Sequence, residues 1–277
     1  MLIGFSIDIP SGNSLLKKII KNTCLFNCLQ VMFDSQNLSE EELENTKKYL
    51  KKFKFVFVHS TYKINIGSDF LINSDKNDEG FFYNSSYEYL LTEIKYAYTI
   101  KANAIIIHMG RNVQKRCDND IIYNNMIIFV IHLFSSKIIK KDFKIIFETS
   151  AGQGGEMCYE LIDFINFIKT FEDYDFYDSI GICIDTCHIF QAGYDLNNIK
   201  VINKIHELFK PLKHKISLIH LNDSYHKVGK HIDRHQNIGE GYIKTNNLKK
   251  FIKPYKNIPM ILETPNIFKS LENLFEK

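Results

Sequence analysis

The chain has 277 residues, of which 45% are hydrophobic and 24% charged, and its formal net charge is +3. This length allows one large core, either a single α/β barrel or two smaller domains, and the mildly basic charge permits a polyanionic partner without demanding one. No run of about 18 apolar residues is present, which excludes a transmembrane helix. No Cys-x-x-Cys pair occurs, which argues against a zinc ribbon or a thioredoxin-like protein.

The amino terminus and the cysteines bear on the compartment. Met1 to Asp8 lacks the charged and long apolar regions of a signal peptide. Cys24 and Cys28 lie four residues apart and could share a helix face or a local disulfide. Reduced thiols in a cytosolic or nuclear compartment are the expected state. We therefore expect a soluble intracellular protein, cytoplasmic or nuclear.

In chain order, short apolar runs alternate with segments of helical period. The runs predict strands at 2–8, 28–33, 53–59, 104–108, 143–147, 180–188, 216–220 and 259–262. Helices are expected to begin at about 15 and to span 39–52, 85–101, 121–140, 158–171, 196–209, 246–252 and 267–275. Ser39 followed by three glutamates predicts a capped helix start. The gap between Thr61 and Ser85 predicts a long loop or lid.

Alternation of eight strands and helices predicts an α/β fold, a single (β/α)8 TIM barrel over residues 1–277. The alternative is a doubly wound open sheet. That fold usually carries a glycine-rich phosphate loop after its first strand, and the sequence from Pro10 to Asn13 is not one.

Imidazole and carboxylate side chains recur at the carboxyl ends of the predicted strands. In a barrel these ends converge on one face, the face that carries active sites. One such histidine is more often a core residue, but seven groups buried without partners would be very costly, and cations are the natural compensation. The seven are His59, His108, Glu148, Asp185, His188, His220 and Glu263.

The loop after the seventh strand adds Asp233, His235 and Glu240. Ten groups exceed the needs of one metal ion, because a catalytic zinc takes about three protein ligands. The sequence therefore predicts two or three metals, a combination that suits hydrolysis of a phosphodiester.

Five segments, in the same order, resemble the endonuclease IV family of apurinic/apyrimidinic endonucleases, and the resemblance extends over nearly the whole chain. The segments are 148–154, 183–195, 220–223, 233–241 and 261–264. The family is a (β/α)8 barrel with three zinc ions that acts in DNA repair. Manganese and iron accept similar ligands and could replace zinc.

The resemblance implies a role for each ligand. It assigns His59, His108 and Glu148 to the first zinc, Glu148, Asp185, His220 and Glu263 to the second, and His188, Asp233 and His235 to the third. A hydroxide between the first two ions would attack the phosphate 5′ to an abasic site, with Glu148 bridging the ions and positioning the nucleophile. The products would be a 3′-hydroxyl and a 5′-deoxyribose phosphate. Glu240, Asn222 and Asp223 fall outside this set and are expected to support the ligands or their loops.

The implied partner is double-stranded DNA that contains abasic sites, bound by a monomer. Tyr62 matches a family position that fills the gap in the DNA. Gln36 and Asn37 lie where relatives often have arginine beside the glutamine, so Asn37 predicts either weaker insertion or compensation by a neighbouring residue. Lys227 and Arg234, with Lys230 and His231, supply positive charge for phosphates, although these side chains could equally belong to a solvated loop.

Two other functions remain open. A metal-dependent sugar isomerase or epimerase on the same barrel would need fewer metals, and the third ligand set argues against it. A catalytically dead DNA-binding module predicts broken ligand sets, whereas all nine implied ligands are present.

Overall fold

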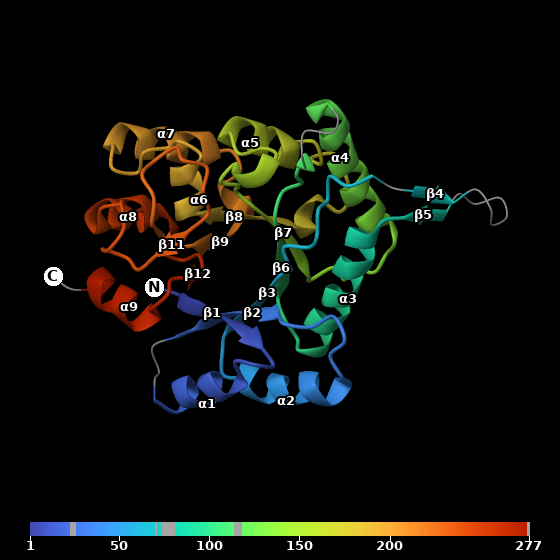
Figure 1. Ribbon diagram of the computed structural model, residues 1–277, viewed down its shortest axis with the longest axis horizontal. Coiled ribbons are helices and arrows are strands. Elements are labelled where there is room, and N and C mark those ends of the chain that lie inside the picture. Colours follow the sequence, from blue (N-terminus) through green and yellow to red (C-terminus); the bar gives the residue numbers. More distant parts are fainter. Residues whose placement is uncertain (23–25, 70, 74–80, 114–117, 276–277) are drawn as a thin grey trace.

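Eight parallel strands form a closed barrel in the computed structural model, which describes residues 1–22, 26–69, 71–73, 81–113 and 118–275 (Figure 1). The order around the barrel is β1-β12-β9-β8-β7-β6-β3-β2. The strands are β1 (Ile3–Ile9), β2 (Cys28–Phe33), β3 (Phe55–His59), β6 (Ala104–Ile107), β7 (Lys144–Glu148), β8 (Ile180–Asp185), β9 (Ile216–His220) and β12 (Met260–Leu262). The predicted TIM barrel is therefore confirmed.

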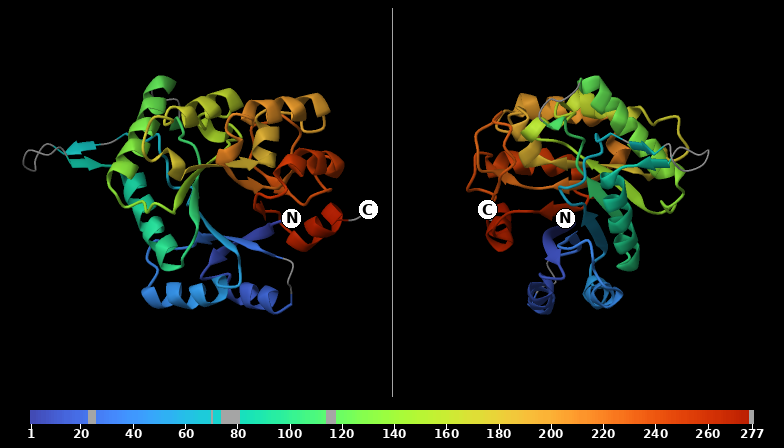
Figure 2. Two further views of the ribbon diagram at one scale, coloured as in Figure 1. Left: turned by 180° about the vertical axis from the view of Figure 1, so that it is seen from behind. Right: turned by 45° about the vertical axis from the view of Figure 1, so that its right-hand side comes forward.

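Helices surround the barrel, as the views from two sides show (Figure 2). They are α1 (Asn13–Asn22), α2 (Glu40–Leu50), α3 (Ser85–Thr99), α4 (Asn119–Ser135), α5 (Leu161–Lys169), α7 (Ile199–Phe209), α8 (Thr245–Ile252) and α9 (Ile267–Phe275). The predicted cap of α2 is present: the Glu42 backbone N–H donates to Ser39 Oγ at 3.3 Å, and the Ser39 N–H donates to the Glu42 carboxylate at 2.8 Å.

The barrel interior is filled by apolar side chains below the strand ends. They form a compact cluster that includes Phe57, Ile106, Ile146, Leu218 and Ile261. A larger apolar layer joins the outer faces of the strands to the helices. Because the interior is packed, the polar strand ends form the floor of a site on one face rather than the lining of a pore.

The strand predicted at 180–188 is shorter than expected. β8 ends at Asp185, and α6 (Thr186–Gln191) follows directly. Asp185 Oδ1 accepts the backbone N–H of His188 at 2.8 Å and so caps this helix, a role that aspartate favours. The prediction that this strand extends to His188 was wrong, and His188 instead lies in the first turn of α6.

The predicted loop after Thr61 contains an antiparallel hairpin, β4 (Leu71–Asn73) and β5 (Phe81–Tyr83), which projects from the barrel in Figures 1 and 2. Cys28 is a buried free thiol, and Cys24 lies outside the described residues. No helix in the described part of the chain is both long enough and apolar enough to cross a membrane.

Candidate metal centre

Four histidines surround the carboxylate of Glu148 at the end of β7. Glu148 Oε1 lies 2.7 Å from His220 Nδ1 and 3.4 Å from His188 Nδ1. Glu148 Oε2 lies 3.1 Å from His59 Nε2 and 3.6 Å from His108 Nε2. Glu148 is 1% exposed, so this carboxylate is a buried hub between several potential ligands.

Two further groups extend from this hub. Glu148, Asp185, His220 and Glu263 have ligand atoms within 4.8 Å of one another, and so do His188, Asp233 and His235. Asp233 Oδ1 lies 3.2 Å from the Nε2 atoms of both His188 and His235. The structure thus brings together all nine residues that the sequence assigns to metals, although which ligand serves which ion stays a prediction.

The donor set fits metal ions. His108 Nε2 is buried and has no hydrogen-bond partner among the described residues, while it points at the Glu148 carboxylate. The His108 ring centroid lies 5.0 Å from that of His59 and 5.8 Å from that of His188. Leaving a buried ring nitrogen without a partner is costly, and a cation held between His108 and Glu148 would satisfy it. Imidazole and carboxylate ligands of this kind suit zinc.

Each of three histidines is oriented through its other ring nitrogen. His59 Nδ1 lies 2.9 Å from the Ser60 carbonyl, and His188 Nδ1 lies 2.9 Å from the Thr149 carbonyl. His220 Nε2 lies 2.8 Å from Gln30 Oε1. A carbonyl oxygen accepts from N–H, so in the neutral ring each contact leaves the opposite nitrogen with a lone pair for a metal.

Gln30 is a supporting residue that the sequence analysis missed. Besides contacting His220, it donates from Nε2 to Glu263 Oε1 at 2.6 Å and to Ser6 Oγ at 3.2 Å. Gln30 is a polar residue within the apolar run 28–33, and that position alone does not indicate its partners.

Asn222 and Asp223 support the site, as the sequence analysis expected. Asn222 Nδ2 donates to Asp185 Oδ2 at 2.7 Å and to Glu263 Oε2 at 3.2 Å. Asp223 accepts backbone N–H groups from Gly239, Gly241 and Ile243 at 2.8–3.1 Å. A Cβ at Gly241 would lie 2.3 Å from the Ser224 carbonyl oxygen, so this close approach requires glycine.

Glu240 lies apart from the centre. It pairs with Lys269 and accepts from Asn237 Nδ2 at 2.7 Å. It therefore braces its own loop, in agreement with its exclusion from the ligand set.

Burial and neighbouring charges shift the pKa values of the titratable groups at the centre in different directions. Burial raises the pKa of Glu148, but three neighbouring histidines, with His220 foremost, outweigh burial and hold that pKa well below its usual range. Burial opposes the charged form of His188, but Asp185 and Asp233 raise its pKa well above the usual value. Burial lowers the pKa of His108 to about 4, so this imidazole is neutral at pH 7. The Glu148 carboxylate is thus ionised, and His108 has a lone pair available.

The predicted DNA contacts are divided between the rim and the interior. The Tyr62 side chain is 53% exposed, and its ring centroid lies 5.1 Å from that of His108. Asn37, Lys227 and Arg234 are exposed. Gln36 instead turns inward and donates from Nε2 to Glu93 Oε1 at 2.9 Å.

Two further residues near this rim escaped the sequence analysis. Arg111 donates from Nη2 to the Tyr62 carbonyl at 2.5 Å. Glu93 in α3 is fully buried, accepts the Thr61 backbone N–H at 3.3 Å, and has its pKa raised to about 7 by burial. In the sequence Glu93 looks like any surface glutamate of a helix, so nothing there indicates that it is buried.

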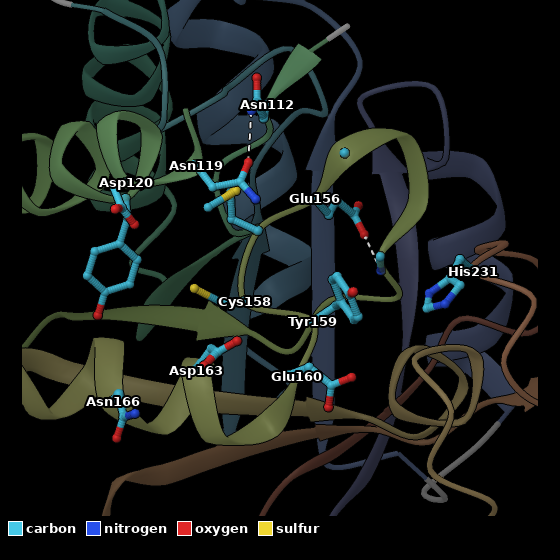
Figure 3. Close-up of a pocket in the computed structure, with 14 residues that line it drawn as sticks. Asn112, Asn119, Asp120, Glu156, Cys158, Tyr159, Glu160, Asp163, Asn166 and His231 are labelled. Atoms are coloured by element: carbon cyan, nitrogen blue, oxygen red, sulfur yellow. Dashed lines mark hydrogen bonds between the residues drawn. The ribbon is translucent and has the colours of Figure 1, made fainter. Parts of the chain in front are cut away.

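A groove of about 750 Å³ lies beside the centre, and Figure 3 shows its lining residues. Asp120, Glu156, Glu160 and Asp163 contribute carboxylates to it, and His231 lies at one end. None of the described residues that line it is lysine or arginine. The groove is therefore a poor place for a DNA phosphate.

Comparison with known proteins shows sequence matches over most of the chain. Residues 25–275 match the family model described as a xylose isomerase-like TIM barrel. The chain is 32% identical to a probable endonuclease 4 of Mycoplasmopsis pulmonis, over 95% of this chain and 92% of that protein. It is 35% identical to a probable endonuclease 4 of Thermosipho africanus, over 82% and 77%.

Among solved structures, endonuclease IV from Thermus thermophilus superimposes with a TM-score of 0.73 at 20% identity, covering 99% of this chain and 96% of that one. A D-tagatose 3-epimerase-like protein reaches 0.70 at 18% identity, covering 99% and 94%. At these identities the structures establish the shared fold alone.

Proposed function

Because the chain belongs to the endonuclease IV family of apurinic/apyrimidinic endonucleases, we propose that it hydrolyses the phosphodiester 5′ to an abasic site in double-stranded DNA. The products would be a 3′-hydroxyl and a 5′-deoxyribose phosphate. The observation that carries this proposal is the buried Glu148 carboxylate, which four histidines surround and which adjoins a second acidic group. Residues 1–277 would form one domain that acts as a monomer.

We further propose three metal sites, with zinc as the expected ion and manganese or iron as substitutes. His59, His108 and Glu148 would hold one ion, Glu148 with Asp185, His220 and Glu263 a second, and His188, Asp233 and His235 a third. When bound, the ions would supply Lewis acidity that ionises a water and neutralises charge on the phosphate.

The residues of the chain would position the reactants. Glu148 is ionised at neutral pH, so its carboxylate would help to hold the cations and would accept a hydrogen bond from the attacking water. Gln30 and Asn222 hold Glu263 by hydrogen bonds to both of its oxygens. Such fixed ligands keep the site in one geometry during the reaction.

DNA contacts are proposed for the exposed rim. Tyr62, next to the His108 ring, would insert where the abasic nucleotide leaves the helix, and Asn37 would contact the same gap. Lys227 and Arg234 would bind phosphates. The Gln36 side chain, which is bonded to Glu93, would contact DNA only after rotating away from Glu93. Otherwise Gln36 would contribute by fixing the shape of its loop.

The alternative function is a sugar isomerase or epimerase, which the D-tagatose 3-epimerase-like fold keeps open. The group of His188, Asp233 and His235 favours the nuclease, because a third ion has no evident task in proton or hydride transfer at a sugar carbon.

The test is cleavage of a labelled duplex that carries one tetrahydrofuran abasic analogue, which cannot undergo β-elimination. Wild type should nick on the 5′ side and leave an end that a DNA polymerase extends. Glu148→Gln should lose at least about 100-fold in rate, the scale of losing one preorganised charge in an active site. Glu207→Gln is the matched control, because that carboxylate is exposed and pairs with Lys210 at the end of α7.

Two outcomes count against the proposal. No nick by a wild-type protein that metal analysis shows to be fully loaded would refute the nuclease and favour sugar substrates. Full activity of Glu148→Gln would leave the nuclease but refute the bridging role of Glu148.

A further inference from the structure

The segment from Ile232 to Gln236 has two different faces. Asp233 and His235 point toward the metal centre, where they lie 3.2 Å apart. Ile232 and Gln236 line a separate cavity of about 610 Å³. Alternate side chains of an extended segment point to opposite sides, so the cavity lies one strand away from the proposed third metal site.

This cavity, which we call the tyrosine cavity, is lined by Tyr225, Lys227, Lys230, Ile232, Gln236 and Tyr242 together with His226 and Glu240. Its frame is the two-stranded sheet of β10 (Asp223–Ser224) and β11 (His235–Gln236). The Tyr225 N–H donates to the Arg234 carbonyl at 2.9 Å, and the Tyr242 N–H donates to the Ser224 carbonyl at 2.9 Å. The Tyr225 backbone is thus bonded to the segment that carries His235, and the Tyr242 backbone to Ser224, which pairs with His235 in the sheet.

Two tyrosine side chains remain largely in solvent at this cavity. Tyr225 is 58% exposed and Tyr242 is 49% exposed. Packing does not use these rings fully, and large aromatic side chains held at the surface around a cavity are typical of ligand contacts. The cavity volume lies within the range of about 300–1,000 Å³ that small-ligand sites occupy.

The charge at the tyrosine cavity favours an anion. Lys227 and Lys230 are exposed, and no described acid pairs with them. Glu240, the carboxylate that lines the cavity, is already paired with Lys269. The neighbouring groove in Figure 3 is lined by four carboxylates and by no described lysine or arginine. An anionic ligand that meets this face would therefore select the tyrosine cavity.

We propose that the tyrosine cavity binds an unpaired nucleotide in a single-stranded flank of the DNA substrate. The base would stack on Tyr225 and Tyr242, and Lys227 and Lys230 would contact its phosphates. Aromatic faces beside cations are the usual means of binding single-stranded nucleic acid, and they tolerate any base. This inference rests on the proposed function and extends it to gapped or frayed DNA near the lesion.

Binding here would also act on the metal centre. The tyrosines hydrogen-bond through their backbones to Arg234 and Ser224, and Ser224 pairs with His235 in the sheet. A nucleotide in the tyrosine cavity would hold this segment still and so favour the positions of Asp233 and His235. An abasic duplex with a single-stranded flank should therefore bind more tightly than a blunt one.

The experiment measures binding of a fluorescent, undamaged thymidine decamer to the metal-loaded protein by anisotropy. An undamaged strand offers no abasic site, so this readout is independent of cleavage. Tyr225→Ala and Tyr242→Ala should each weaken binding by about 5- to 150-fold, the range for loss of one base–aromatic stack. Tyr225→Phe keeps the ring and should bind like wild type, and Tyr89→Ala, an exposed tyrosine of α3, is the matched control.

Salt dependence tests the lysines. Replacement of both Lys227 and Lys230 by alanine should flatten the plot of log affinity against log salt by about 1.4, because each phosphate contact to a single strand contributes about 0.7.

Three results would overturn the proposal: no decamer binding by wild type, unchanged binding by both alanine variants, or equal displacement of the decamer by a polyglutamate peptide. The last would mark a general anion site for acidic peptides. Nicking of the blunt abasic duplex by wild type tests the proposed function separately, so either idea can fail alone.

Discussion

Replacing Gln30 by methionine should loosen the metal centre without changing its ligands. Gln30 is fully buried in β2 and bridges two ligands of the proposed second site. Its Oε1 lies 2.8 Å from His220 Nε2, and its Nε2 donates to Glu263 Oε1 at 2.6 Å. Methionine keeps the length of the side chain and removes both contacts.

The expected loss has two parts. The His220 N–H and one Glu263 oxygen would lose their partner, and each buried polar group left unsatisfied costs about 1–3 kcal/mol of stability. His220 would also be free to rotate or to change tautomer, so zinc affinity should fall about 10- to 100-fold, the usual effect of removing a partner of a metal ligand.

The assay is titration of metal-free protein with zinc against a competing chelator, with urea unfolding measured alongside. Thr46→Val is the matched control, because Thr46 is 1% exposed and accepts from Asn13 Nδ2 at 3.0 Å, far from the centre. It should lose stability and keep its zinc affinity. If Gln30→Met is destabilised like the control and binds zinc like wild type, the argument that Gln30 fixes His220 is refuted.

Four other outcomes are expected. Glu93→Ala should raise KM for abasic DNA several-fold with little change in kcat, because Glu93 holds Gln36 and Thr61 at the rim; steady-state rates on the tetrahydrofuran duplex check this. Because the pKa of Glu93 is raised to about 7, folding with its carboxyl ionised is unfavourable, and wild type should lose up to about 3 kcal/mol relative to Glu93→Gln as pH rises from 5 to 8, measured by urea unfolding. Zinc binding should release protons and weaken as pH falls, since the pKa of His188 is raised in the metal-free protein; calorimetry in buffers of different ionisation heat reports this. Removing metal with a chelator should lower Tm, and zinc should restore it; with free zinc at 100 times its Kd the difference is about 2.7 kcal/mol.

Local signals in the sequence account for most of the barrel. Apolar runs such as 28–33 and 216–220 coincide with β2 and β9, because a strand buried on both faces needs continuous apolar side chains. Seven of the candidate ligands were expected from topology, since parallel strands of a barrel end on one face, whereas the resemblance to a family supplied the choice of Asp233 and His235. Asp185 shows the limit of apolar patterns, because the same residue ends β8 and caps α6. The switch from strand to helix takes place within three residues, which is too short for the hydrophobic period to reveal it.

The supporting residues were not predictable for a different reason. Gln30 acts on partners 190 and 233 positions away in the chain, and Glu93 acts on partners 57 and 32 positions away. A buried glutamine or glutamate stands out in a sequence only when its partners are known, and those partners meet only after the barrel closes. Polar groups of this kind are satisfied through the tertiary fold, not through local pattern.

The fold alone leaves the chemistry open, because an epimerase-like protein and an endonuclease IV superimpose on it almost equally well. What separates the two functions in this chain is the loop that carries Asp233 and His235. Asp223 builds that loop by accepting the backbone N–H groups of Gly239, Gly241 and Ile243. The third ligand group therefore depends on one buried carboxylate and one close glycine contact at the strand ends, and a change there should remove the proposed third metal site while leaving the barrel intact.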